Sequence, residues 1–371
     1  MIRIAHLTSV HGRKDVRILL KECASLARAG YETHLIVADG RGPTQYQGVQ
    51  IHDVGAAGSR ATRMLCKPWA ILKAALALDA RVYHFHDPEL IGIGLLLRAA
   101  GRRVVYDAHE DVPRQILSKP WIPPALRRPV SWLFERVEDF AARRFDAVVA
   151  ATPFIARRFA RSNAAAVDIN NFPILDEFAS GPQAASPARH GNGRTLCYVG
   201  GLSENRGAAA IVSVLERLDA RCILAGGFES AALKKRLQAM PGWAKVDYRG
   251  VVDRQGIAAI LAESDIGLVL LHPIPNYLDA LPIKMFEYMS AALPVVSSDF
   301  PLWRGIVEAN GAGICVDPCD TDSIVRVVES LLADPARRQA MGQAGRRVVE
   351  KECNWETEST KLAALYQTLT H

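Results

Sequence analysis

The sequence predicts an α/β protein that contains two doubly wound parallel sheets. Short runs rich in β-branched residues alternate with helical patterns along most of the 371 residues. Such alternation is typical of parallel sheets, because helices cover both faces of their strands. The composition changes at residues 178–193, which are small, polar and rich in proline and glycine. We interpret this segment as a linker between two domains.

The first predicted domain covers residues 1–177. Apolar periodicity predicts helices over 16–30, 67–79 and 89–100, and a long helical stretch follows residue 111. Its expected strands are 2–9, 32–39, 49–55, 81–87, 103–110 and 146–152, with a short strand that ends at 168–169.

The second predicted domain covers residues 194–355. Its expected strands are 194–201, 220–227, 245–250, 266–271, 294–298 and 313–317, and its expected helices are 207–217, 229–239, 255–263, 282–291 and 320–332. A helical end over 356–371 follows. Ligands of such sheets bind beyond the carboxyl ends of the strands, so we expect a site in the cleft between the two domains.

Composition narrows the protein class. The chain is 49% apolar and 23% charged, which is ordinary for a globular protein, and no run is long enough to span a membrane. The opening residues read as a strand, not as a signal peptide. The seven cysteines are scattered without zinc-ligand spacing. We therefore expect a cytoplasmic protein with reduced thiols.

The positive charge is concentrated in the first domain. Residues 1–177 hold 25 Lys and Arg against 18 Asp and Glu. Within them, segment 125–145 combines arginines with Trp132, Leu133, Phe134 and Phe140, which suits a helix on the anionic inner face of a membrane. The alternative is an ordinary amphipathic helix packed on its own domain. Nucleic acid is not an expected partner, because no recognition module is present.

Residues 271–299 carry the strongest chemical pattern. Pro282 suits the first position of a helix, which leaves the amides of Ile283 and Lys284 as donors for a phosphate. Lys284 and Glu287 are three residues apart and share a helix face. A cation for phosphate beside a carboxylate for a diol suits a nucleotide diphosphate sugar. The alternative is a solvated surface ion pair.

Several motifs, in order along the chain, resemble one known family. They are DVRILLKECASLARAGYETHLI, HFHDPEL, YDAHED, YVGGLSENRG, DYRGVV, PIKMFEYMSAALPVVSSD and NWETESTKLAALYQTL. Together they resemble retaining glycosyltransferase family 4, the glycosyl transferases group 1, and cover nearly the whole chain. The resemblance implies the GT-B architecture of two Rossmann-like domains, and a terminal helix over 356–371 that crosses back to the first domain.

The resemblance also implies donor-binding residues in the second domain. Glu287 matches the acid that holds the ribose, and Asp279 stands where the family has a glutamate that contacts the transferred sugar. The family often has Phe-Gly where this chain has Leu281 and Pro282. Gly200 precedes Gly201, which replaces an arginine of the family, and Arg206 replaces a lysine. We therefore predict that Arg206 and Lys284 together stabilise the leaving diphosphate.

The remaining site predictions concern the base and the acceptor. Val251 follows a strand end where the family seats its base, although a plain core strand end is the alternative. His109 matches a family histidine near the reacting sugar, and Glu110 is its neighbour. Asp87 is either an acceptor residue or the cap of the next helix. Arg17 is either a surface cation or a contact to an acceptor phosphate.

The implied reaction transfers a sugar from a nucleotide diphosphate sugar with retention of configuration. A UDP-sugar is favoured and a GDP-sugar is possible, and the expected acceptor is a glycan or a lipid-linked glycan of bacterial polysaccharide or lipopolysaccharide assembly. No DxD metal motif accompanies the site, so we expect no cofactor and no metal requirement. The alternatives are a nucleotide-sugar epimerase and a non-catalytic nucleotide-sugar-binding protein. The missing glycine fingerprint disfavours a dehydrogenase.

Overall fold

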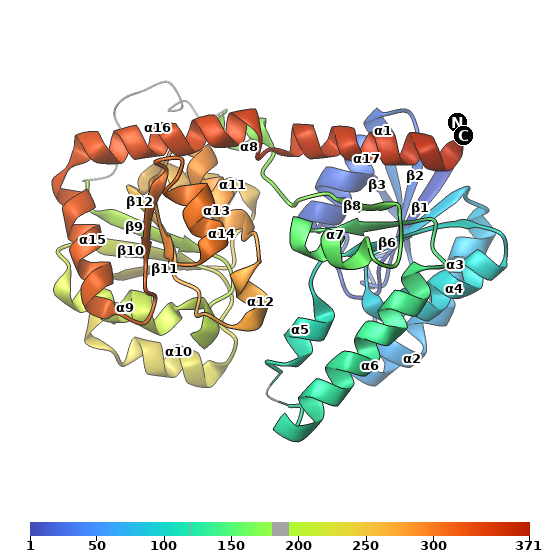
Figure 1. The fold of residues 1–371 in the computed structure, drawn as a ribbon, viewed down its shortest axis with the longest axis horizontal. Helices are drawn as coiled ribbons and strands as arrows, with labels where there is room; N and C mark the ends of the chain where they lie inside the picture. The colour runs from blue at the N-terminus through green and yellow to red at the C-terminus, as the bar shows by residue number, and fades with distance from the viewer. Residues whose placement is uncertain (120, 180–192) are drawn as a thin grey trace. The chain divides into compact units, whose positions relative to one another are not determined.

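The computed structural model describes residues 1–119, 121–179 and 193–371, and it contains two compact units (Figure 1). Unit 1 consists of Met1–Asn171 and Trp355–His371, and unit 2 consists of Phe172–Asn354. The C-terminal segment therefore belongs to unit 1. The boundary lies after Asn171 and not at residue 177, and most of the linker expected at 178–193 falls outside the described residues.

The sheet of unit 1 has the order β3-β4-β2-β1-β5-β6-β7-β8. Its strands are β1 (Arg3–Leu7), β2 (Glu32–Val37), β3 (Thr44–Tyr46), β4 (Val49–Asp53), β5 (Val82–Phe85), β6 (Arg103–Ala108), β7 (Ala147–Ala150) and β8 (Ala166–Asp168). All neighbours pair in parallel except β3, which pairs antiparallel to β4. The sequence pattern did not predict β3, because its three residues are all exposed and carry no buried face.

The helices of unit 1 begin with an eight-residue π-helix, η1 (Val16–Cys23), which continues into α1 (Ala24–Arg28). The sequence predicted one ordinary helix over 16–30. The other helices are α2 (Arg60–Leu65), α3 (Lys67–Leu78), η2 (Pro88–Leu90), α4 (Ile91–Ala99), α5 (Val112–Ile116), α6 (Pro124–Ala142), α7 (Pro153–Phe159) and the C-terminal α17 (Trp355–Thr370).

The sheet of unit 2 is parallel throughout, in the order β11-β10-β9-β12-β13-β14. Its strands are β9 (Thr195–Val199), β10 (Arg221–Ala225), β11 (Val246–Gly250), β12 (Ile266–Val269), β13 (Val295–Ser298) and β14 (Gly313–Val316). Numbered within the unit, this order is 3-2-1-4-5-6, the doubly wound arrangement. The order reverses between β9 and β12, so a ligand is expected beyond the carboxyl ends of these two strands.

Helices cover both faces of the unit 2 sheet. They are α8 (Leu175–Ala179), η3 (Glu204–Arg206), α9 (Ala208–Arg217), α10 (Ala231–Gln238), η4 (Pro241–Lys245), α11 (Arg254–Glu263), α12 (Pro275–Leu278), α13 (Ile283–Ser290), α14 (Pro301–Val307), α15 (Thr321–Ala333) and α16 (Pro335–Lys351). Alternate residues of β9 enter different cores. Leu196 and Tyr198 pack with α9 and α15, whereas Cys197 and Val199 pack with α11, α13 and α14.

The unit 1 sheet is apolar on one face and mixed on the other. Leu7, Phe85 and Tyr106 enter the larger core with α3, α4 and α7. On the opposite face a smaller apolar cluster lies between η1 and strands β2 and β4. Buried polar residues of β1, β5 and β6 share that face. Among the described residues, no helix combines the length and the apolar character needed to cross a membrane.

Candidate functional site

The loop after β9 brings backbone close to a lysine in unit 2. Gly200 has φ +130°, a conformation that side chains other than glycine rarely adopt. A Cβ atom at Gly200 would lie 2.8 Å from Nζ of Lys284. Gly200 is therefore required both by its backbone conformation and by the approach of Lys284. This loop follows the first strand at the point where the strand order reverses.

A second cation lies over the same loop. A Cβ atom at Gly201 would lie 2.7 Å from Nη1 of Arg206, the last residue of η3. An arginine at position 201, as in the family pattern, would have to displace the Arg206 side chain from this position. The replacement of that arginine by Gly201 and the placement of Arg206 are thus linked.

Lys284 is buried and unpaired. Its side chain lies in the first turn of α13, the residue is 8% exposed, and Nζ has no hydrogen-bond partner among the residues that the structure describes. Nζ lies 3.5 Å from the centre of the Tyr198 ring, which is a cation–π distance. Burial lowers the pKa of Lys284 well below its ordinary value, and the charge of Arg206 lowers it further, whereas Glu287 raises it. Lys284 and Arg206 therefore place two basic side chains close together at this loop.

The start of α13 differs in one detail from the prediction. Pro282 has φ −69° and ψ 120° and occupies the N-cap position, so the helix begins at Ile283. The prediction that Pro282 is the first helical residue is therefore wrong. Its carbonyl accepts a hydrogen bond from the Met285 amide at 3.0 Å. The amides of Ile283 and Lys284 remain in the first turn, where a helix provides no partner for them.

Glu287 is paired with an arginine that the sequence analysis did not single out. The carboxylate is 3% exposed, and Nη1 of Arg254 donates to its Oε1 at 2.6 Å. Arg254 also donates to Glu177 of α8. The alternative of a solvated surface pair between Lys284 and Glu287 is wrong, because both residues are buried and no such pair occurs among the described residues.

The loop before α13 holds the other predicted donor residues. Asp279 directly follows α12 and is partly exposed. Nε1 of Trp303 donates to the Ala280 carbonyl at 2.8 Å, and Leu281 packs against the buried core that contains Trp303. The loop that carries Asp279 is therefore anchored by the hydrogen bond at the next residue, Ala280.

Val251 lies beyond the end of β11 and is 81% exposed. The alternative of a core strand end is therefore wrong for this side chain. Gly250, with φ +69°, turns the chain just before it. The residue is available to a flat ligand, and its role as the seat of the base stays a prediction.

In unit 1, His109 follows β6 and contacts two buried residues. Its side chain is 18% exposed, and Nε2 lies 2.9 Å from Oδ2 of Asp107 and 3.1 Å from Nδ1 of His86. Asp107 is fully buried, and its pKa is lowered well below its ordinary value, because the charges of Arg17 and His109 oppose the effect of burial. A carboxylate thus fixes the ring of His109, which remains partly exposed.

The structure places Arg17 inside unit 1. The residue is 3% exposed, and its guanidinium donates to Asp107 at 2.8 and 3.0 Å and to the Ile169 carbonyl at 2.7 Å. Both predicted roles, a surface cation and a contact to an acceptor phosphate, required an exposed side chain. That placement is wrong, because the buried carboxylate of Asp107 draws the guanidinium inward.

Asp87 occupies the N-cap position of η2 without a side-chain capping bond. Its Oδ2 accepts instead from the backbone amides of Ser9 and Val10, at 2.6 and 3.1 Å, and from the Thr8 hydroxyl at 2.8 Å. The capping prediction is therefore wrong, because this carboxylate fixes the loop after β1. Glu110 is exposed and contacts Gln115.

The sequence analysis did not predict that His84, His86 and Asp107 lie together. Only the alternation of residues along the strands could have revealed this. His84 and His86, like Asp107 and His109, alternate along their strands and therefore lie on one sheet face. The register pairs His6 with His84 across β1 and β5. No such signal exists for Arg254, whose partners are distant in the sequence.

Two family models match the chain. Glycosyl transferases group 1 matches residues 182–348, and the glycosyl transferase 4-like domain matches residues 16–173. The chain belongs to the group 1 glycosyltransferases. The two matches occupy the second and first halves of the chain, in the order that the motifs predicted.

Known relatives agree with this assignment. The GDP-mannose-dependent alpha-(1-6)-phosphatidylinositol monomannoside mannosyltransferase of Mycolicibacterium smegmatis is 24% identical, over 86% of this chain and 88% of that protein. Sucrose-phosphate synthase of Thermosynechococcus elongatus has a TM-score of 0.78 at 18% identity, with 100% and 99% of the two chains covered. HepE of Anabaena, solved with UDP-glucose, has a TM-score of 0.76 at 15% identity, with 99% and 100% covered. The predicted GT-B fold is confirmed.

Proposed function

We propose that this glycosyltransferase transfers a hexose from a nucleotide diphosphate sugar to a glycan or a lipid-linked acceptor, with retention of configuration. The observation that carries the proposal is the buried, unpaired ammonium group of Lys284 beside Arg206. Natural proteins rarely bury a cation without a partner. A diphosphate supplies the missing negative charge.

The donor is proposed to bind across unit 2. Its diphosphate meets Lys284, Arg206 and the first amides of α13, which lie at the positive end of a helix. Close approach to backbone is possible at Gly200 and Gly201, since neither has a side chain. The base rests at Val251, and Asp279 contacts the sugar.

We propose that Glu287 binds the ribose. One of its oxygens, Oε1, already accepts a hydrogen bond from Arg254. A carboxylate has about four acceptor positions, so Glu287 can accept from a diol while the ion pair with Arg254 persists. Arg254 then orients the carboxylate.

Transfer is proposed to occur on one face of the sugar. The bond between the anomeric carbon and the phosphate oxygen breaks, the acceptor oxygen bonds to the same carbon, and the departing phosphate takes the acceptor proton. Lys284 and Arg206 stabilise the charge that develops on the leaving group. Retention follows because attack and departure share a face. No metal ion has a role in this scheme.

His109 is proposed to face the reacting sugar. Asp107 contacts one ring nitrogen of His109 and so sets the orientation of the ring. Glu110 and Asp87 are retained as proposed acceptor residues. Asp87 acts through the loop that it holds.

The acceptor is proposed to be presented at a membrane, on the cytoplasmic side. Along α6, large apolar residues recur at intervals of three and four and are 39% to 59% exposed: Leu126, Val130, Leu133, Val137 and Phe140. The helix instead buries Ser131 and Glu138. This apolar stripe is flanked by arginines at 127, 128, 136, 143 and 144. Basic charge beside exposed apolar side chains is complementary to an anionic bilayer.

The relatives' names suggest acceptor and donor classes. The mannosyltransferase relative is named as GDP-mannose-dependent with a phosphatidylinositol-based acceptor, and HepE was solved with UDP-glucose. We propose a lipid-linked acceptor of bacterial cell-surface polysaccharide assembly, and either UDP or GDP as the nucleotide.

A ligand screen tests the donor proposal. Thermal unfolding is measured with UDP, GDP, ADP and their sugars, because a ligand at 100 times its Kd stabilises the folded state by about 2.7 kcal/mol. One nucleotide should raise the midpoint, and Glu287→Gln should reduce that rise. Release of nucleotide only after acceptor is added supports transfer. Release without acceptor, with a new sugar epimer formed, contradicts it.

A liposome experiment tests the membrane proposal. The protein should float with vesicles that contain anionic lipid at low salt, and it should stay in solution with neutral vesicles. Leu133→Ser with Val137→Ser should abolish flotation, whereas Leu302→Ser, at another exposed leucine in unit 2, should not. A concentration-dependent dimer that the double variant abolishes, without flotation, contradicts membrane binding.

A further inference from the structure

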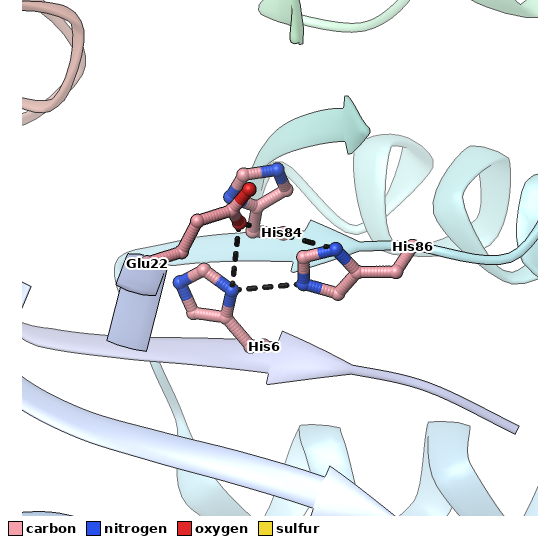
Figure 2. A group of neighbouring side chains, drawn as sticks. All are labelled: His6, Glu22, His84 and His86. Atoms are coloured by element: carbon pink, nitrogen blue, oxygen red, sulfur yellow. Dashed lines mark hydrogen bonds and ion pairs between the residues drawn. The ribbon is translucent and has the colours of Figure 1, made fainter. Parts of the chain in front are cut away.

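A separate polar cluster lies on the mixed face of the unit 1 sheet. It consists of His6 from β1, Glu22 from η1, His84 from β5 and His86 directly after β5, shown in Figure 2. All four residues are buried, and one potential ligand atom from each lies within 4.8 Å of the others. The donor site in unit 2 uses none of them.

Each histidine has one ring nitrogen held by an outer partner. Nδ1 of His86 lies 3.0 Å from Oδ2 of Asp107. The hydroxyl of Tyr366, on α17, lies 2.9 Å from Nδ1 of His84 and 3.2 Å from Nε2 of His6. Histidines that bind metals hold their second nitrogen in this way, because the outer bond fixes the tautomer and aims the ring.

Part of the cluster lacks hydrogen-bond partners. Within the described residues, both carboxylate oxygens of Glu22 and Nε2 of His84 are buried without a hydrogen bond. Glu22 does form an ion pair with Arg17, whose Nε lies 3.1 Å from Oε1, and Nδ1 of His6 lies 2.9 Å from Nε2 of His86. A buried polar atom without a partner disfavours folding. Several such atoms gathered in one place suit the binding of an ion.

We propose that His6, Glu22, His84 and His86 together bind one divalent transition-metal ion, with zinc the first choice. Three imidazole nitrogens and one carboxylate oxygen form a tetrahedral zinc set, whereas calcium and magnesium prefer oxygen ligands. With zinc–nitrogen bonds of about 2.0–2.1 Å, ligand atoms are about 3.3 Å apart. His6 Nδ1 lies 2.9 Å from His86 Nε2 and 3.9 Å from Glu22 Oε2, and the His86 ring is stacked on those of His6 and His84, so the rings must turn to close around an ion.

The ion has a structural role, because four protein ligands leave no open position for a substrate. It joins β1, β5 and η1 directly, and it reaches α17 through Tyr366. Other contacts attach the same helix to unit 1, including the Trp355 indole, which donates to the Ser25 hydroxyl at 2.9 Å. The proposed metal-independent transfer in unit 2 is a separate matter.

One rival explanation needs no ion. Burial raises the pKa of Glu22 well above its ordinary value, and the charge of Asp107 raises it further, so the carboxyl group could be neutral. Glutamine is neutral and has the same shape. Glu22→Gln should therefore be tolerated if Glu22 is a neutral buried acid, and it should lose the ion if Glu22 is a ligand.

The test measures metal content and unfolding of the full chain, expressed with added zinc and freed of any affinity tag. Mass spectrometry of the wild type should find close to one zinc per chain. Glu22→Gln should contain little and should unfold at a lower temperature. His52→Gln is the control, because His34 and His52 form a similar pair, 2.9 Å apart, outside the cluster. It should keep its zinc.

Three outcomes would overturn the proposal. The first is a wild type that holds no zinc and gives no tetrahedral cobalt spectrum when Co²⁺ replaces zinc in the growth medium. The second is zinc retained in Glu22→Gln. The third is a Glu22→Gln variant that is at least as stable as the wild type. If that variant fails to fold, the zinc content of the wild type decides. None of these measurements involves nucleotide or activity, so the result is independent of the donor proposal.

Discussion

The buried side chain of Lys284 lowers the stability of the unliganded protein, and we propose that it also binds the diphosphate. An unpaired ammonium group in the interior disfavours folding, whereas a diphosphate beside it is favoured. Lys284→Met should therefore raise the stability of the unliganded protein, by about 1 kcal/mol, and lower turnover by about 100- to 1,000-fold. Nucleotide affinity should fall much less than turnover. Thermal unfolding, steady-state kinetics and calorimetry measure the three effects.

Lys245 is the matched control for that substitution. Its Nζ donates to the carbonyls of Leu215 and Leu218, at 2.8 and 2.6 Å. Lys245→Met leaves these carbonyls without a donor, so it should lower stability and leave turnover unchanged. A Lys284→Met variant that loses stability and keeps its turnover would contradict the assigned role.

The lowered pKa of Lys284 predicts that diphosphate binding takes up protons. In the unliganded fold, burial and Arg206 lower this pKa well below 10.5, whereas a bound diphosphate should raise it. Between the two pKa values the complex holds more protons than the free protein. Calorimetry between pH 7 and 10, in buffers of different ionisation enthalpy, measures the uptake. Wild type should show uptake and Lys284→Met should show none.

The lowered pKa of Lys284 also determines whether stability rises or falls with pH. Between the folded pKa of Lys284 and its unfolded value of 10.5, the unfolded chain binds more protons than the folded chain. This residue therefore makes the unliganded protein more stable as the pH rises through that range. Equal pH slopes in wild type and Lys284→Met would show that Lys284 does not titrate there.

For single residues, the sequence marked those candidates of the donor site that lie close together along the chain. Lys284 and Glu287 share a helix turn, and Gly200 to Arg206 form one loop. Arg254 was missed, because its pairing with Glu287 depends on how α11 packs beside α13. The inward position of Arg17 was missed for the same reason, since it depends on Asp107 of β6.

Among the elements, the β9 loop offers a test that separates strain from ligand contact. Gly200→Ala places a Cβ atom against Lys284, whereas Gly311→Ala, at φ +64°, meets open space. Both variants carry backbone strain of about 1–3 kcal/mol. Only Gly200→Ala should lose the thermal shift on nucleotide addition. Equal loss in both variants would attribute the effect to strain alone.

The sequence predicted thirteen of the fourteen strands that the structure describes, because most of them carry a run of buried residues. It missed β3, which has no such run. It also missed the π-helix, because propensity and periodicity do not distinguish i→i+5 from i→i+4 hydrogen bonding. The apolar stripe of α6 was visible in the sequence, but its outward direction required the structure.

For the whole molecule, the presence of two separate cores predicts that the two units respond differently to a bound nucleotide. Each unit has its own sheet and buried apolar clusters, so the units need not unfold together. The nucleotide selected by the screen should protect unit 2 against hydrogen exchange much more than unit 1. Exchange read by mass spectrometry measures this. Equal protection of both units would mean that they unfold as one, or that the nucleotide contacts both.

Family membership and fold were predictable at this scale, because the order of several weak motifs is more specific than any one of them. The boundary between units was less so. A change in composition marked residues 178–193, whereas the change in packing comes after Asn171. Residues 172–177 belong to unit 2 although they precede the predicted linker, and their composition does not reveal this.

The π-helix has a consequence for how the chain length can vary. Arg17 and Glu22 are five residues apart, which in an α-helix would separate their directions by about 140°. A wider turn brings Glu22 within 3.1 Å of Arg17, which also contacts Asp107. Deleting one residue here would let the backbone relax into an ordinary helix at little cost, but it would rotate one of the two charges away. Homologues shorter by one residue at this point should therefore lack one of the pair.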